Sequence, residues 1–111
     1  NIGTLAVSRY LVKNRNDYVC FRVNGRSMEP DIHHGDILLI NKNCTWRQAM
    51  QSIVAVNVNG EITLKKFNLD SSNRMIILNS TNQSYSPIVI DPESQQDIQL
   101  IGSLAYLFRK Y

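Results

Sequence analysis

The chain has 111 residues, of which 43% are hydrophobic and 19% are charged, and its formal net charge is +3. This length suits one domain with its own core, and the composition is that of a globular chain rather than a disordered one. The wholly apolar runs have at most five residues, far short of the roughly 18 in a membrane-spanning helix, and no secretory signal opens the chain. We therefore expect a cytoplasmic protein that does not contact a membrane.

The two cysteines and the distribution of charge are not diagnostic of a ligand. Cys20 and Cys44 are far apart and belong to no C-x-x-C motif, so we expect no metal and no cofactor. Basic residues crowd the first quarter of the chain without a helix-turn-helix pattern. A solvated surface explains them better than direct binding of DNA.

The predicted elements begin after an irregular opening. Residues 1–17 show no clean hydrophobic period, so we expect an arm or connector there and one folded domain over 18–111. Residues 18–24 have the composition of a β-strand, and the turn formers of 25–30 end it. A loop that carries Ser27 should therefore leave the end of a strand, and a short second strand is expected over 37–40.

A β-hairpin is the clearest local signal in the chain. Two β-rich runs, Ile53–Val58 and 61–67, flank Asn59-Gly60, a dipeptide that supplies the two positive φ angles of a tight hairpin turn. Further strands are expected over 74–78, 87–90 and Ile98–Phe108. Six or seven short strands at close spacing predict a compact, mainly β domain with mostly antiparallel pairing.

Two adjacent lysines stand inside the predicted hairpin. Pairing across the turn sets Lys65 opposite Val54 and Lys66 opposite Ile53, so their side chains point to opposite faces of the sheet. Both faces are apolar, and periodicity does not decide which lysine is buried. Burial disfavours the charged form, so a buried lysine would hold a neutral amine that can act as a general base. The plainer alternative is that both lysines lie at the surface.

Ser27 is the candidate partner of such a lysine. A serine on a glycine-containing loop can expose its hydroxyl and point backbone amides at a developing oxyanion. Serine is also ordinary in turns, so the local pattern alone does not settle its role. His33 and His34 suggest a serine–histidine site as an alternative, but adjacent histidines in a polar turn are more often inert.

The order and spacing of these motifs resemble the LexA, UmuD and phage-repressor peptidase family. Residues 23–30 and 35–40 are similar to its nucleophile motif, and 60–67 are similar to its lysine motif, in which the first lysine of the pair is catalytic. Ser27 and Lys65 lie 38 residues apart, as in that family. The resemblance covers about 18–108, and its closing strands are matched by Leu78-Asn79, Asn82, Tyr85, Pro87-Ile88 and Ile101-Gly102.

The resemblance implies a self-cleaving regulatory domain. It implies a LexA-like C-terminal domain with a partly open, barrel-like sheet, in which Ser27 is the nucleophile and Lys65 the general base. The Met28 amide would be an oxyanion donor, and Lys66 would be replaceable. Family members form dimers through the C-terminal strands, here Ile98–Phe108, and are cut when RecA filaments on single-stranded DNA favour the cleavable conformation. Operator DNA would be bound by an N-terminal domain that this chain lacks.

The sequence departs from the family pattern in three respects. It has no Ala-Gly or Cys-Gly dipeptide, and only 26 residues precede Ser27, so we expect the cleaved segment upstream of Asn1 or not at all. The glycine usual before the 53–58 strand is replaced by Gln51-Ser52.

Four functions remain open at this point. The leading one is the C-terminal regulatory domain of a phage- or SOS-type transcriptional repressor. A UmuD-like accessory protein of an error-prone DNA polymerase shares the same domain. A signal peptidase also uses a serine and a lysine but needs a membrane anchor, which this chain does not show. A pure dimerisation module without chemistry is the fourth.

Overall fold

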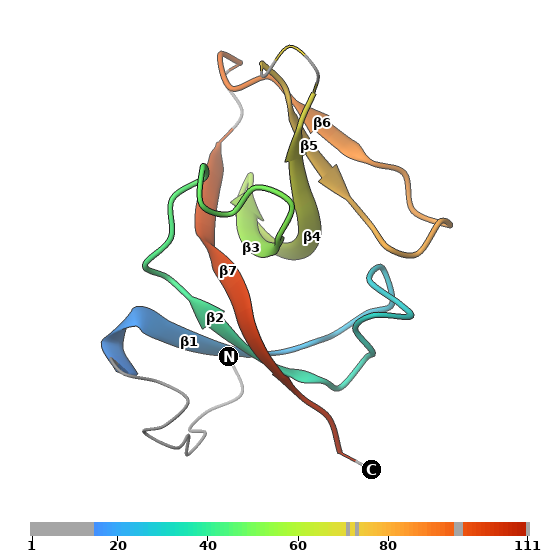
Figure 1. Cartoon of the computed structure of the whole chain (residues 1–111). Helices are drawn as coiled ribbons and strands as arrows, with labels where there is room; N and C mark the ends of the chain where they lie inside the picture. Colours follow the sequence, from blue (N-terminus) through green and yellow to red (C-terminus); the bar gives the residue numbers. More distant parts are fainter. Residues whose placement is uncertain (1–14, 71, 73, 95–96, 111) are drawn as a thin grey trace.

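The computed structural model describes residues 15–70, 72, 74–94 and 97–110 (Figure 1). Most of the predicted arm over 1–17 lies outside the described residues, and only its end is seen, as a short 3-10 turn η1 (Arg15–Asp17). The part of the chain that is described contains no helix long and apolar enough to cross a membrane.

A single antiparallel sheet makes up the domain. Its seven strands are ordered β1-β2-β7-β3-β4-β5-β6, and β1 and β6 form its two edges, so the sheet is not closed. This confirms the prediction of a compact, mainly β domain with a partly open sheet. The strands are β1 (Tyr18–Arg22), β2 (Ile37–Asn41), β3 (Ile53–Val58), β4 (Glu61–Leu69), β5 (Ile76–Asn79), β6 (Ile88–Ile90) and β7 (Ile98–Phe108).

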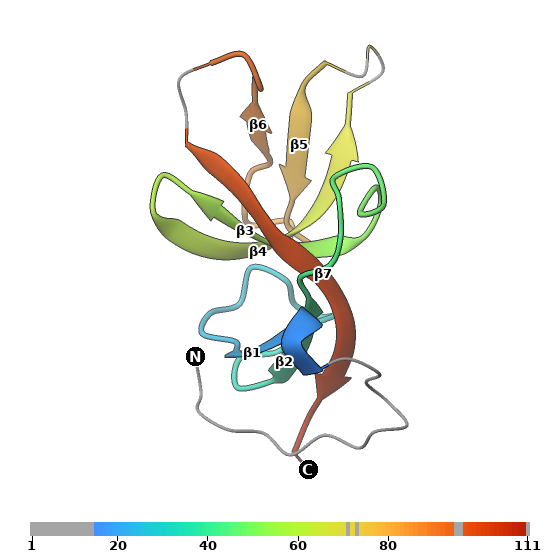
Figure 2. The ribbon, with the colours of Figure 1, turned by 90° about the vertical axis from the view of Figure 1, so that its left-hand side faces the viewer.

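The long strand β7 joins the two halves of the sheet. Its first half pairs with β3 and its second half with β2, and the register shifts in both pairings (Figures 1 and 2). Such bulges bend a strand and increase its twist, which lets β7 pass from one half to the other. At Gly102 a Cβ would overlap the backbone carbonyl of Asn41, so only glycine allows β2 and β7 to approach this closely.

Each face of the sheet carries its own hydrophobic cluster. Along β3 the side chains alternate, so Val54 and Val56 enter one cluster and Ala55 enters the other. The first cluster also contains the fully buried Phe67 and Leu78. The second cluster is built from Val23, Met28, Ile32, Leu38, Ile40 and Ala55. The loop between β1 and β2 is therefore anchored by its own apolar side chains.

The hairpin between β3 and β4 has the predicted register. Val58 pairs with Glu61 and Val54 with Lys65, and Asn59 and Gly60 have φ angles of 52° and 91°. Lys65 lies on the face of the first cluster with 6% of its surface exposed, whereas Lys66 is exposed. The structure therefore makes the choice between the two lysines that the apolar pattern left open.

Some strand boundaries differ from the prediction. The strand predicted over 74–78 begins at Ile76 because the Asp70 carboxylate accepts the backbone N–H groups of Arg74 and Met75 and holds them in the turn. The first strand ends at Arg22, although Val23 still exchanges backbone hydrogen bonds with Gly35 and Asp36.

Gln51 occupies the left-handed backbone region, with a φ angle of 66°. A side chain there costs roughly 1 kcal/mol, which glycine avoids. We therefore expect Gln51→Gly to raise the free energy of unfolding by about 0.5 kcal/mol, because the greater freedom of glycine in the unfolded chain offsets part of the gain. Urea denaturation measures this. Asn59→Gly, at another positive φ, is the control and should not stabilise, because the Asn59 side chain accepts the Asp97 N–H.

Candidate functional site

The loop between β1 and β2 holds Ser27 at the surface of the second cluster. The side chains of Met28 and Ile32 are 2% and 1% exposed and anchor this loop in that cluster. Gly25 and Gly35 take the positive φ angles of its two sharp bends. Ser27 therefore lies directly beside a buried anchor, which restricts where its hydroxyl can lie.

The side chain of Lys65 lies next to the hydroxyl of Ser27. Its Nζ donates a hydrogen bond to Ser27 Oγ at 3.0 Å, although 38 residues separate the two along the chain. Burial lowers the pKa of the Lys65 ammonium, because removal from water disfavours the charged form. The Tyr85 ring lies beside the amine, with 5.9 Å between Nζ and the ring centroid. A neutral amine at this distance can accept the proton of the serine hydroxyl.

Two backbone donors stand next to the hydroxyl. Within the part of the chain that the structure describes, the amide N–H groups of Ser27 and Met28 have no hydrogen-bond acceptor. Both are thus available to an external oxygen. Amides that flank a nucleophile are suited to stabilise the negative charge that develops on an attacked carbonyl.

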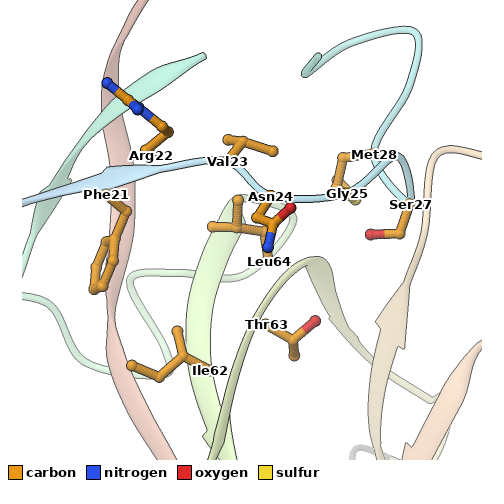
Figure 3. Close-up of a pocket in the computed structure, with 10 residues that line it drawn as sticks. All are labelled: Phe21, Arg22, Val23, Asn24, Gly25, Ser27, Met28, Ile62, Thr63 and Leu64. Carbon is orange, nitrogen blue, oxygen red and sulfur yellow. The ribbon is translucent and has the colours of Figure 1, made fainter. Parts of the chain in front are cut away.

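Two hollows adjoin the pair. One, of about 280 Å³, lies between the segment 21–25 and residues 62–64 of β4, with Ser27 at one end (Figure 3). The other, of about 430 Å³, contains Lys65, Tyr85 and Ser80. The hydroxyl oxygen of Ser80 is buried and has no hydrogen-bond partner in the described structure.

The first half of β4 has a free edge beside the hollow that contains Ser27. Strand β5 pairs with β4 only from Lys66 onward, so residues 61–65 are bonded to β3 alone among the described strands. Ile62 on this segment is 51% exposed. A free edge next to a groove is suited to bind an extended peptide as an added strand.

The two histidines form hydrogen bonds within the loop and, in the described structure, none with Ser27. His34 Nδ1 accepts the N–H of Gly25 at 3.1 Å, and His33 Nε2 lies 3.0 Å from the carbonyl oxygen of Pro30. The serine–histidine alternative therefore has no hydrogen bond to support it in the described structure.

The loop between β5 and β6 completes the site, although its sequence pattern indicates no role. In the sequence, Asn82 and Tyr85 are only positions that match the resembled family. The structure places Tyr85 beside Lys65, and Asn82 bonds to the backbone of the Ser27 loop. No local signal in the sequence marks these contacts, because each joins segments that are distant along the chain, and Asn82 and Arg26 are 56 residues apart.

Comparisons with known proteins show the family to which the chain is related. The model of the family described as Peptidase S24-like matches residues 1–105. The LexA repressor of Desulfatibacillum aliphaticivorans is 38% identical over 110 residues, which cover 98% of this chain and 52% of that protein. The LexA repressors of Carboxydothermus hydrogenoformans and Clostridium novyi are 35% and 28% identical, over 81% and 97% of this chain and 42% and 50% of those proteins. The chain thus spans about half the length of the curated relatives it matches.

Proposed function

Because the chain belongs to the Peptidase S24-like family, we propose that it is the C-terminal regulatory domain of a phage- or SOS-type transcriptional repressor, which cuts its own polypeptide with Ser27 and Lys65. The observation that carries this proposal is the 3.0 Å hydrogen bond between Ser27 Oγ and the Nζ of a lysine that is 6% exposed. A lysine at the surface would stay charged and could not remove the proton from a hydroxyl.

The chemistry proceeds in two acyl-transfer steps. The neutral amine of Lys65 takes the proton of Ser27, and Oγ attacks the carbonyl carbon of the scissile peptide bond. The Met28 amide donates to the oxyanion, and the Lys65 ammonium then gives its proton to the leaving amine. Water attacks the resulting ester, with Lys65 again as the base, and releases Ser27.

The substrate is an extended segment of the same polypeptide. The free edge over residues 61–65 would pair with the backbone of this segment, and the hollow lined by 21–25 and 62–64 would take its side chains. Holding the segment as a strand brings its carbonyl to Ser27 in a fixed orientation, which removes much of the entropic barrier to attack.

Dimerisation of the repressor would use the second half of β7. Residues 104–108 pair with β2 on one side only, so their other edge has no partner strand within the described residues. A second copy of the chain could pair along this edge in an antiparallel manner. Binding of operator DNA by an N-terminal domain and induction by RecA filaments complete the proposal for the whole protein.

The test is the rate of self-cleavage of the full-length protein over about pH 7 to 10, a range that reaches the ordinary pKa of lysine. The rate is expected to rise with pH and level off above the depressed pKa of Lys65, because only the neutral amine is a base. Ser27→Ala and Lys65→Ala should abolish cleavage, while the exposed Lys66→Ala retains it. Sedimentation of the uncut Ser27→Ala protein reports the dimer.

Equal loss of cleavage in the two lysine variants would contradict the assignment of Lys65. Cleavage that persists in Ser27→Ala would rule out this serine as the nucleophile. A wild-type protein that is not cut at any pH would leave a dimerisation module without chemistry.

A further inference from the structure

Asn82, in the loop between β5 and β6, forms two hydrogen bonds to the backbone of the loop that carries Ser27. The backbone N–H of Asn82 donates to the carbonyl oxygen of Ser27 at 3.0 Å. Its side-chain Nδ2 donates to the carbonyl oxygen of Arg26 at 3.1 Å. Asn82 therefore anchors two consecutive peptide groups of the loop that carries Ser27.

The geometry of the peptide group gives these two bonds a directional effect. In a planar trans peptide the C=O of one residue and the N–H of the next point in opposite directions. The Arg26 carbonyl shares its peptide with the Ser27 N–H, and the Ser27 carbonyl shares its peptide with the Met28 N–H. The Arg26 carbonyl also accepts the N–H of Glu29 at 3.1 Å, so Asn82 adds a second donor there. By bonding to both carbonyls, Asn82 directs both amides away from itself, where they have no acceptor among the described residues.

Asn82 is itself held in place. Its Oδ1 accepts the N–H of Ser84 at 3.0 Å, and its carbonyl accepts the N–H of Tyr85 at 3.1 Å. The side chain thus uses an acceptor and a donor at the same time, which an amide provides and a carboxylate or an alkyl group does not. The turn that bonds Asn82 also carries Tyr85, whose ring lies beside Lys65.

We propose that Asn82 is a positioning residue that sets the direction of the Ser27 and Met28 amides toward the oxyanion of the cleavage reaction. This inference rests on the proposed function. Asn82 touches neither the substrate nor the reacting atoms in this scheme, and it acts through the backbone of the nucleophile loop.

The neighbouring Thr81 provides a matched control. Its hydroxyl donates to Asp31 Oδ2 at 3.4 Å and to Met28 Sδ at 3.9 Å. Thr81 therefore also ties the two loops together, but through side chains and not through the peptide groups of Ser27 and Met28. A purely structural tie predicts similar effects at the two positions. A positioning role predicts an effect on the reaction at Asn82 alone.

The experiment measures self-cleavage of the full-length protein with Asn82→Ala, Asn82→Asp and Thr81→Val. Asn82→Ala should lower the plateau rate at high pH by about 10- to 100-fold, less than the full loss of an oxyanion donor. The effect is partial because the bond from the backbone N–H of residue 82 to the Ser27 carbonyl and the bond from Glu29 to the Arg26 carbonyl both remain. The midpoint of its pH profile should not move, since Lys65 is unchanged. Asn82→Asp keeps the acceptor for Ser84 and loses the donor to Arg26, so its plateau rate should fall at least as far. Thr81→Val should keep the wild-type plateau.

Two further measurements separate positioning from loss of folding. Thermal denaturation gives the folded fraction at the assay temperature, and labelling of Ser27 by a fluorophosphonate reports its reactivity without any cleavage segment. Asn82→Ala should be labelled about 10- to 100-fold more slowly per folded molecule, since the phosphonyl oxygen uses the same amides. Equal plateau and labelling rates in Asn82→Ala and the wild type would overturn the inference while leaving the proposed function intact. Equal losses in Asn82→Ala and Thr81→Val would also overturn it. A wild type that is neither cut nor labelled would overturn both.

Discussion

Replacing Lys65 by methionine is expected to abolish self-cleavage and, at pH 7, to make the fold more stable. Lys65 is 6% exposed and faces the apolar first cluster, and in the described structure its ammonium donates a hydrogen bond to the neutral hydroxyl of Ser27. Methionine fills a similar volume without a group that loses hydration. Replacement of buried charged groups by apolar ones often stabilises, and we expect a gain of about 1 kcal/mol in the free energy of unfolding.

The dependence of this gain on pH follows from the direction of the pKa shift. The pKa of Lys65 is lower in the folded state than its ordinary value of 10.5. Between the two values the unfolded chain binds one more proton than the folded chain, so the stability of the wild type rises with pH. Below the folded pKa the wild type carries the full penalty, and above about 10.5 it carries none. The advantage of Lys65→Met should therefore be largest at neutral pH and fade as the pH rises through this window.

Urea denaturation at pH 7 and near pH 10 measures the effect, with Ser27→Ala in the background to prevent cleavage. Lys66→Met is the matched control, because Lys66 is exposed on the opposite face and should change the stability little. A Lys65→Met protein that is less stable than the wild type at pH 7 would show that the amine contributes to folding. In that case burial of Lys65 would not lower the stability of the fold, and the site would not be an example of activity gained at the expense of stability.

The hairpin shows how far the sequence could predict the site. The Asn59-Gly60 turn fixed the register, and the register placed Lys65 and Lys66 on opposite faces, as the structure has them. Which face is buried depends on what packs there, and that is decided by loops distant in the sequence. The apolar pattern of β3 and β4 is the same on both sides, so only the resemblance to a family favoured Lys65.

For the same reason, contacts between loops that are distant along the chain could not be predicted from the sequence. Asn82 is an ordinary turn residue by its local pattern, and its bonds to Arg26 and Ser27 exist only because β5 places its loop against the loop after β1. The departure at Gln51 was visible in the sequence as a missing glycine, and the structure shows its physical form, a side chain at positive φ. For Arg109, near the C-terminus, no local pattern in the sequence indicates a structural role.

Removal of Arg109 is expected to destabilise the fold strongly, because it leaves a buried carboxylate without its partner. Asp36, at the end of the loop that carries Ser27, is 2% exposed. Arg109 donates to it twice, from Nε at 2.9 Å and from Nη2 at 2.7 Å, and the backbone N–H of His33 donates at 2.8 Å. Breaking a buried pair from one side costs about 3 to 5 kcal/mol. The Arg109 side chain is 42% exposed, so we expect Arg109→Ala to cost about 3 kcal/mol, at the low end.

Acid should reveal the same interaction. The hydrogen bonds from Arg109 hold the pKa of Asp36 below its ordinary value of 3.8, against the opposing effect of burial. The stability that this carboxylate contributes is therefore present above about pH 3.8 and is lost as the pH falls through its lower folded pKa. In Arg109→Ala burial is no longer opposed by the guanidinium, the pKa of Asp36 rises, and acid unfolding should begin at a higher pH than in the wild type.

Urea denaturation at pH 7 and acid titration of the Ser27→Ala protein measure both effects, with the exposed neighbour Lys110→Ala as the control. Arg109→Lys should recover only part of the loss, because one ammonium cannot reproduce the two-pronged contact of the guanidinium. Arg109 follows β7 directly, and Asp36 closes the loop that carries Ser27. The pair thus ties the strand proposed for dimerisation to the loop proposed for cleavage, and an Arg109→Ala protein as stable as the wild type would show that this tie does not hold the loop.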